Sequence, residues 1–129
     1  MTIAGLNHFN IIAPTGLLAD VRAFYVDIIG LSEGWRPDFD FDGHWLYAGD
    51  APILHLMAGD EASEITSKST GHLDHIALTA SDLESVEARM IELGQSYSKR
   101  DVAGTTITQL FLYDPIGLGV ELNFGTRNG

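Results

Sequence analysis

Short stretches of alternating hydrophobic and polar residues are joined by longer stretches with a helical period, and this order occurs twice along the chain. The first half predicts a strand, a helix and two strands at residues 6–12, 17–29, 44–47 and 53–57. The second half predicts the same order at residues 73–79, 83–93, 107–112 and 120–124. This repetition predicts two similar modules.

Both predicted helices are amphipathic. Their apolar residues recur every three or four positions, at Leu18, Val21, Tyr25 and Ile28 in the first helix and at Leu83, Val86, Met90 and Leu93 in the second. Gly30 and Gly94 follow these helices, and glycine takes the left-handed conformation that ends a helix without strain. Ser81 and Glu84 have the spacing of a capping box, which predicts that Ser81 caps the second helix.

The alternation within the strands separates apolar side chains from titratable ones, because successive side chains of a strand point to opposite faces. In the first strand Phe9 and Ile11 share one face, and His8 and Asn10 share the other. The same alternation sets His55 against Leu54 and Leu56, His75 against Ile76 and Leu78, and Glu121 and Asn123 against Val120, Leu122 and Phe124. We therefore expect the helices to cover the apolar faces and to leave the histidines and the glutamate on the opposite face.

These titratable residues also occupy matching positions of the two halves. His8 and His75 lie 67 residues apart (75 − 8), and His55 and Glu121 lie 66 apart (121 − 55). If their face of the sheet curves into a cup, three imidazoles and one carboxylate converge, and such a set suits zinc, iron, manganese, cobalt or nickel. The alternative is four ordinary half-exposed strand residues. The matching positions favour the metal site.

The composition describes one globular domain. A chain of 129 residues with 45% hydrophobic residues can bury a single core. We expect one domain over residues 1–129, with modules at about 1–58 and 72–126 and a linker at about 59–71. The absence of cysteine excludes disulfides and thiolate metal sites. The start of the sequence carries no basic signal segment and the longest apolar window contains charges, so we expect a cytoplasmic protein and no membrane span.

The charge balance restricts the partners. Seven basic residues stand against eighteen acidic ones, a formal net charge of −11, and the only local basic pair is Lys99 and Arg100. Nucleic-acid binding needs clustered basic side chains, so we expect no nucleic-acid partner. The acidic residues are typical of a solubilising surface, and the alternative is an acidic pocket for a cationic ligand.

Three stretches of the sequence carry a family resemblance, namely LNHFNII, GHLDHIALTASDL and QLFLYDPIGLGVELNF. They resemble the vicinal oxygen chelate superfamily, which includes glyoxalase I, extradiol dioxygenases, fosfomycin-resistance enzymes and bleomycin-resistance proteins. In the last stretch Asp114-Pro115-Ile116-Gly117 has the composition of a turn and precedes the strand of Glu121. The resemblance implies an α+β fold in which two βαβββ modules form an open, cup-shaped mixed sheet with the helices outside.

The resemblance also implies a divalent metal ion, held by His8, His75 and Glu121 with His55 at the fourth position. It further implies a homodimer, and the ligands come either from one chain or from both. His55 stands where glyoxalase I carries a glutamate, which puts glyoxalase activity in doubt. His55 is either a fourth ligand or an acid/base group, and Glu121 is counted with it among the catalytic residues.

The activity implied is that of a metal-dependent enzyme acting on a small organic molecule with neighbouring oxygens, either a glyoxalase-like lyase or isomerase or an extradiol-type dioxygenase. The alternative is a non-catalytic binding protein similar to the bleomycin-resistance proteins. The acidic charge and the aromatic residues favour that alternative, and these residues are Trp35, Phe39, Phe41 and Trp45.

Three further residues are candidates for substrate contact. Arg100 follows the second helix and could clamp an anionic group with its two-pronged guanidinium. Tyr113 and Asn123 belong to the face of Glu121 or its edge, where each could bind substrate or orient a metal ligand. His44 is expected at the surface or in the pocket lining, and His72 is expected to point away from the metal site.

Overall fold

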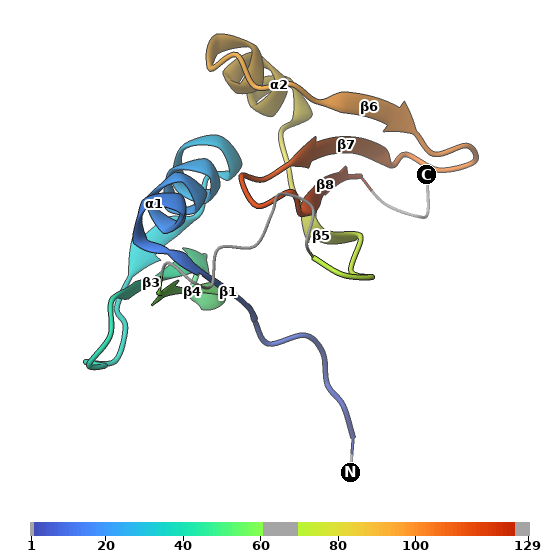
Figure 1. Cartoon of the computed structure of the whole chain (residues 1–129). Coiled ribbons are helices and arrows are strands. Elements are labelled where there is room, and N and C mark those ends of the chain that lie inside the picture. Colours follow the sequence, from blue (N-terminus) through green and yellow to red (C-terminus); the bar gives the residue numbers. More distant parts are fainter. Residues whose placement is uncertain (1, 61–69, 126–129) are drawn as a thin grey trace. The chain divides into compact units, whose positions relative to one another are not determined.

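A computed structural model describes residues 2–60 and 70–125 of the chain. Most of the predicted linker, residues 61–69, lies outside the described residues. The chain divides into two compact units, Met1–Ile65 and Thr66–Gly129, and Figure 1 labels most of their elements. The prediction that residues 1–129 form a single domain stays a prediction.

The first unit is a four-stranded mixed sheet with one helical segment (Figure 1). Its elements are β1 (Phe9–Pro14), α1 (Thr15–Ala23), the π-helical turn η1 (Phe24–Ile29), β2 (Ser32–Gly34), β3 (Gly43–Ala48) and β4 (Ala51–Gly59). The strand order is β1-β4-β3-β2, with β1 parallel to β4 and the other pairs antiparallel.

The second unit repeats this plan. Its elements are β5 (His75–Thr79), α2 (Leu83–Glu92), β6 (Ser98–Asp101), β7 (Thr108–Tyr113) and β8 (Gly119–Phe124). The strand order is β5-β8-β7-β6, again with one parallel pair, β5 and β8. The α+β class and the two βαβββ modules are therefore confirmed. The edge strands β2 and β6 complete each module, although their sequences, SEG and SKRD, lack an alternating apolar pattern.

The predicted separation of the strand faces is confirmed by burial. Buried apolar side chains alternate with more exposed ones along parts of β1, β4 and β7, whereas β8 is buried at every residue except Asn123. The buried set includes Ile11, Leu54, Leu56, Leu110, Leu112, Val120, Leu122 and Phe124. In the first unit α1 contacts β1 and β4 and contributes the buried Leu18 and Val21. In the second unit Met90 of α2 is fully buried. The opposite faces are thereby left for the polar residues.

Both helices end at the predicted glycines. Gly30 (φ 94°) closes η1, and the N–H groups of Gly30 and Leu31 donate to the carbonyl of Tyr25. Gly94 (φ 68°) follows α2, where the Gln95 N–H donates to the Met90 carbonyl at 2.8 Å and the Gly94 N–H to the Ile91 carbonyl at 3.2 Å. This pair of hydrogen bonds is a Schellman motif.

The helix α2 begins at Leu83 as predicted, but its predicted cap is wrong by one residue. The N-cap is Asp82, whose carboxylate accepts a hydrogen bond from the Ser85 N–H at 3.3 Å, and not Ser81. Because α2 begins at Leu83, the third helical N–H belongs to Ser85, and an oxygen on residue 82 is the one that can reach it. Asp82 takes a left-handed conformation with φ 61°.

Candidate functional site

The second unit brings two of the predicted metal ligands together. His75 is the first residue of β5 and Glu121 lies in the middle of the adjacent β8, with Gly119 directly opposite His75 and Ala77 opposite Glu121. The Nε2 atom of His75 lies 3.6 Å from Oε1 of Glu121. The glutamate side chain is only 8% exposed, whereas the imidazole is 44% exposed. The pair therefore joins a buried carboxylate to a ring that solvent and ligands can reach.

The remaining polar atoms of both side chains are engaged elsewhere. The His75 Nδ1–H donates to Oδ2 of Asp74 at 2.8 Å, which leaves Nε2 as the free nitrogen. Oε2 of Glu121 accepts hydrogen bonds from the side-chain amides of Asn123 at 2.8 Å and Gln109 at 3.2 Å, which leaves Oε1 free. Hydrogen bonds of this kind fix the orientation of metal-binding groups in proteins. The two free atoms are the two that face each other.

Gly119 makes room for this arrangement. A Cβ atom at position 119 would lie 2.8 Å from the backbone oxygen of Asp74 and 2.9 Å from Cβ of His75. Both distances are shorter than real Cβ contacts, so a side chain here would displace the start of β5. The glycine thus allows His75 to sit close against β8.

The predicted turn before β8 is held by the buried Asp114. Its Oδ1 atom accepts hydrogen bonds from the N–H groups of Ile116 and Leu118, both at 2.9 Å. Its backbone closes the same turn, since the Asp114 N–H donates to the Leu118 carbonyl at 2.9 Å. The turn therefore fixes where β8 begins, and with it the position of Glu121.

A pocket of about 300 Å³ lies beside the pair, within the second unit. Its lining consists of Asp74, His75, Arg100, Gln109, Phe111, Leu112, Tyr113, Gly119, Val120 and Glu121. Arg100 and Tyr113, two of the predicted substrate residues, thus share a pocket with the predicted ligands. The third, Asn123, contacts Glu121 directly. The pocket combines the carboxylates of Asp74 and Glu121 with one guanidinium.

In the first unit the other two predicted ligands form part of a stack of rings. His55 lies between His8, with ring centroids 3.8 Å apart and an interplanar angle of 14°, and Trp45, at 4.0 Å and 9°. The His55 Nε2–H donates to the Pro52 carbonyl at 3.1 Å, and the His8 Nδ1–H donates to Oδ1 of Asn7 at 2.7 Å. Burial and the neighbouring His8 lower the pKa of His55, against the opposite effect of the hydrogen bond to Pro52. His55 is therefore kept as a neutral imidazole at neutral pH.

The two pairs differ in how well they fit a metal ion. His75 and Glu121 fit, since each keeps one free donor atom and the two atoms face each other. His8 and His55 do not fit as they are oriented, because nearly parallel rings direct their in-plane lone pairs side by side instead of to a common point. Within the described part of the chain, no three His, Cys, Asp or Glu side chains gather closely enough to hold an ion. Each unit thus supplies a pair of candidate ligands.

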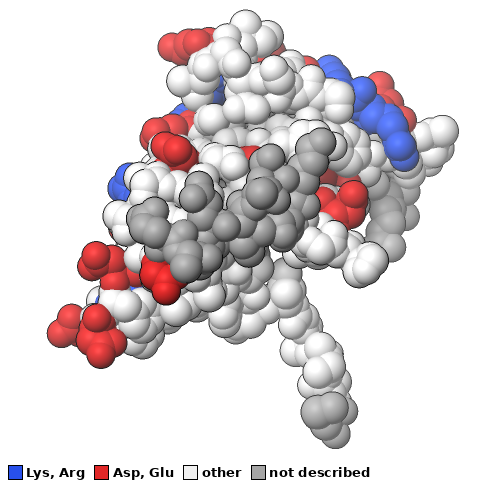
Figure 2. Space-filling view, in the orientation of Figure 1, with Lys and Arg blue, Asp and Glu red and all other residues white. Residues whose placement is uncertain are grey.

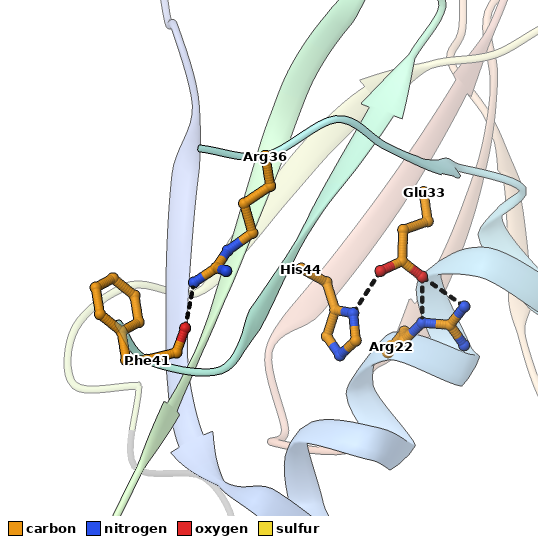
Figure 3. A network of polar contacts seen from close by, with 5 residues as sticks. All are labelled: Arg22, Glu33, Arg36, Phe41 and His44. Atoms are coloured by element: carbon orange, nitrogen blue, oxygen red, sulfur yellow. Dashed lines mark hydrogen bonds and ion pairs between the residues drawn. The ribbon is translucent and has the colours of Figure 1, made fainter. Parts of the chain in front are cut away.

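His44 belongs to a different face of the first sheet. It lies opposite Leu56 in β3 and shares the face of the buried Leu46, away from His55. Its Nδ1–H donates to Oε2 of Glu33 at 2.5 Å, and Arg22 contacts Oε1 of the same carboxylate at 2.6 and 2.7 Å (Figure 3). Burial raises the pKa of Glu33, but the hydrogen bonds and charges of His44 and Arg22 outweigh it and leave that pKa lowered. The network joins α1 to β2 and β3.

The remaining predicted histidine, His72, is exposed in the turn before β5. The aromatic residues between β2 and β3 extend the ring stack. Trp35 meets Trp45 edge-on at 6.0 Å, and Phe39 and Phe41 stack at 4.9 Å. The Arg36 guanidinium lies over Phe39 and Phe41 and donates to the carbonyl of Phe41 (Figure 3).

Three residues of the second unit were not predicted, namely Asp74, Gln109 and Gly119. Asp74 could have been found from the sequence, because it directly precedes His75. The roles of Gln109 and Gly119 depend on which strands pair and in which register, and the sequence contains no local mark of either.

The surface shows the charge imbalance of the sequence. Figure 2 shows acidic groups in several separate places on the visible face and basic groups in fewer. Among the described residues, no helix is both long and apolar enough to span a bilayer.

The sequence matches no family model and no curated protein. Solved structures do match. A glyoxalase family protein from Bacillus anthracis is 23% identical, with a TM-score of 0.72 and 98% of each chain covered. A single-residue mutant of the fosfomycin resistance protein FosX from Listeria monocytogenes, solved with Mn(II) and dihydroxypropylphosphonic acid, is 22% identical, with a TM-score of 0.69 over 97% of this chain and 95% of that chain. TnmS3, an antibiotic binding protein from Streptomyces, is 18% identical, with a TM-score of 0.65 over 98% and 99%.

Identities this low establish the fold and leave the activity open, because one fold hosts many functions. The chain has the vicinal oxygen chelate fold, shared by glyoxalase, fosfomycin-resistance and antibiotic-binding proteins. The resemblance stated from the sequence is confirmed at that level.

Proposed function

We propose that the chain is a divalent-metal-dependent enzyme that acts on a small organic substrate with neighbouring oxygen atoms. His75 and Glu121 hold the ion, and His8 is the third ligand once its ring leaves the stack with His55. His55 is a fourth ligand or the acid/base group, and Glu121 also contributes to catalysis. The observation that supports this proposal is the His75–Glu121 pair, with its free Nε2 and Oε1 atoms 3.6 Å apart beside a pocket. The imidazole pair comes from a first module of the same chain or of a second copy in a homodimer.

Several residues of the pocket, and His55 outside it, have a chemical task in this proposal. A bound Mn, Fe, Zn, Co or Ni ion supplies a Lewis acid for the substrate oxygens. Arg100 binds an anionic group of the substrate through two parallel N–H donors. The Tyr113 hydroxyl binds a further oxygen, and the apolar side chain of Phe111, opposite Glu121, excludes water. If His55 is the acid/base group, its lowered pKa keeps the ring neutral, so that it can accept a proton from the substrate.

One of the solved structures supports the proposal. FosX was solved with Mn(II) and a diol that bears a phosphonate, and an anionic ligand of this type fits a pocket that offers a guanidinium. Whether the reaction of this chain is that of a lyase, an isomerase or an extradiol-type dioxygenase is the next question. A screen of hemithioacetals, epoxides and catechols, with and without oxygen, distinguishes these classes.

Metal content tests the proposal. Protein expressed without added metal is analysed for elements as the wild type and as His75→Ala, Glu121→Gln and His8→Ala. We expect bound metal in the wild type and a loss of at least about tenfold in the variants. His72→Ala is the matched control, because it removes an exposed histidine three residues from His75. A wild-type protein without metal, or variants that keep all of it, would falsify the proposed site.

His55 is tested separately. His55→Ala that loses metal affinity supports a fourth ligand, whereas unchanged affinity with lost turnover supports an acid/base group. If His55→Ala loses neither metal affinity nor turnover, both roles are contradicted.

The ring stack favours a second candidate function, that of a non-catalytic binding protein for flat ligands. His8, His55 and Trp45 are already stacked, and Trp35 and Phe39 extend the array beside acidic residues. TnmS3, which has the same fold, binds an antibiotic. In this case metal-free protein binds a planar aromatic cation such as ethidium, with quenching of tryptophan fluorescence, and His75→Ala has no effect on affinity. Binding that requires His75 and metal contradicts this function.

A further inference from the structure

We propose that Gln109 is a positioning residue for Glu121. Its side-chain amide holds Oε2 of the carboxylate, so that Oε1 stays turned toward Nε2 of His75. This inference rests on the proposed metal site and assigns a role within it that the sequence did not suggest.

The register of the strands places Gln109 where it can act. Gln109 of β7 lies directly opposite Asn123 of β8, and Phe111 lies opposite Glu121. Gln109 is thus the diagonal neighbour of Glu121 on the same face, within reach of a long side chain. Its Nε2 atom donates to Oε2 of Glu121 at 3.2 Å. The contact ties the carboxylate to a strand other than its own.

The orientation of the Gln109 amide points to a role in the site. Its Oε1 atom is buried and has no hydrogen-bond partner among the described residues. Turning the amide over would place that oxygen against the Glu121 carboxylate and lose the donated hydrogen bond. Buried polar atoms without partners are few in native proteins, and a functional constraint is one explanation for them. The contact with Glu121 therefore fixes the amide at the cost of an unpaired carbonyl.

Two donors on one oxygen have a consequence for the other oxygen. The amides of Asn123 and Gln109 both donate to Oε2, from two different strands. With only the Asn123 contact, the carboxylate can rotate about its last bond and exchange its oxygens. The second donor opposes this rotation, so Oε1 remains the atom presented to His75. Gln109 thereby sets the direction in which Glu121 offers its free oxygen.

Two variants of nearly equal volume test the inference. Gln109→Met and Gln109→Leu both remove the donor and keep a side chain of similar size. The affinity of metal-free protein for Mn²⁺ is measured by calorimetry, and the probe is Mn²⁺ alone. We expect a loss of about tenfold to a hundredfold for both variants, the range found when outer partners of metal ligands are removed. Gln95→Met is the control, because the Gln95 amide donates to the Ser96 carbonyl, outside the site.

A second measurement needs no metal. In ¹H–¹⁵N spectra of the metal-free protein, Glu121→Ala should shift the side-chain amide signal of Gln109 and leave that of Gln95 in place. An unmoved Gln109 signal, or equal Mn²⁺ affinities of the wild type and both variants, overturns the role of Gln109 alone. A wild-type protein that binds no Mn²⁺ overturns the proposed metal site, and the role of Gln109 with it.

Discussion

The two modules carry different chemistry at matching positions of the same kind of sheet. In the first, Trp45 lies opposite His55, and in the second, Phe111 lies opposite Glu121, each 66 residues later (111 − 45 and 121 − 55). His55 is stacked between rings, whereas Glu121 accepts hydrogen bonds from two amides. The backbone repeats, and the side chains at corresponding sites decide whether a module offers flat apolar rings or a fixed carboxylate.

The two modules also differ in which element carries the carboxylate that attaches the helix to the sheet. In the first, Arg22 of α1 contacts Glu33 of β2. In the second, Glu87 of α2 accepts hydrogen bonds from Lys99 of β6 at 3.0 Å and from the Tyr97 hydroxyl at 2.9 Å. Each module thus ties its helix to the edge of its sheet with one carboxylate, on the strand in one case and on the helix in the other.

The largest expected effect tests whether the two cores are equivalent. Leu54→Ala in the first module and Leu110→Ala in the second each remove a side chain with no exposed area. Each should lower the free energy of unfolding by about 2–5 kcal/mol. Truncating a buried leucine loses the hydrophobic transfer free energy of the removed atoms and also leaves a cavity. Urea unfolding followed by circular dichroism measures this. A loss confined to one variant would contradict the equivalence.

Gly119 has no counterpart in the first module, where position 53 is an isoleucine (119 − 66). Gly119→Ala should lower the free energy of unfolding by about 1–3 kcal/mol through overpacking against Asp74 and His75. It should also weaken metal binding, because the start of β5 must move. Ile53→Val is the control and should leave metal binding unchanged. An alanine variant of full stability would show that His75 does not depend on the glycine.

His55→Glu gives the first module the residue of the second. A carboxylate between two ring faces meets the negative side of each ring and loses two ring contacts, each contributing about 0.5–1.5 kcal/mol. We therefore expect lower stability and a changed Trp45 fluorescence spectrum. His55→Phe keeps a flat ring and should retain most of the stability. Equal stability of the two variants would contradict the importance of the stack.

The smallest effect concerns the Glu33 network and appears only with pH. Because its pKa is lowered in the folded protein, Glu33 adds stability above its ordinary pKa of 4.5 and loses that contribution as the pH falls through the folded value. The side chains of Arg22 and Glu33 are 40% and 36% exposed, so the effect at neutral pH should stay below about 1 kcal/mol. Unfolding of Glu33→Gln and wild type at pH 7 and pH 3 measures it. The difference between the two proteins should be larger at pH 7 than at pH 3, and a constant difference would contradict this.

Local patterns in the sequence were enough to predict most elements of this fold. The period-2 alternation placed His8, His55, His75 and Glu121 on the face away from the buried leucines, and Gly30 and Gly94 marked the helix ends. These features depend on neighbouring residues along the chain, so they can be read without knowing which strands pair. The edge strands β2 and β6 were not predicted, because their short polar sequences have no such pattern.

The tertiary structure alone decided how the candidate site is supported. That Gln109 reaches Glu121, that Gly119 lies against His75, and that His8 and His55 stack follow from pairing between distant segments. The tertiary structure also placed His44 beside Glu33, on the face of the first sheet that carries α1. The physical reason is the register: a side chain's face is fixed by its own strand, whereas its partners are fixed by the alignment of strands far apart in sequence.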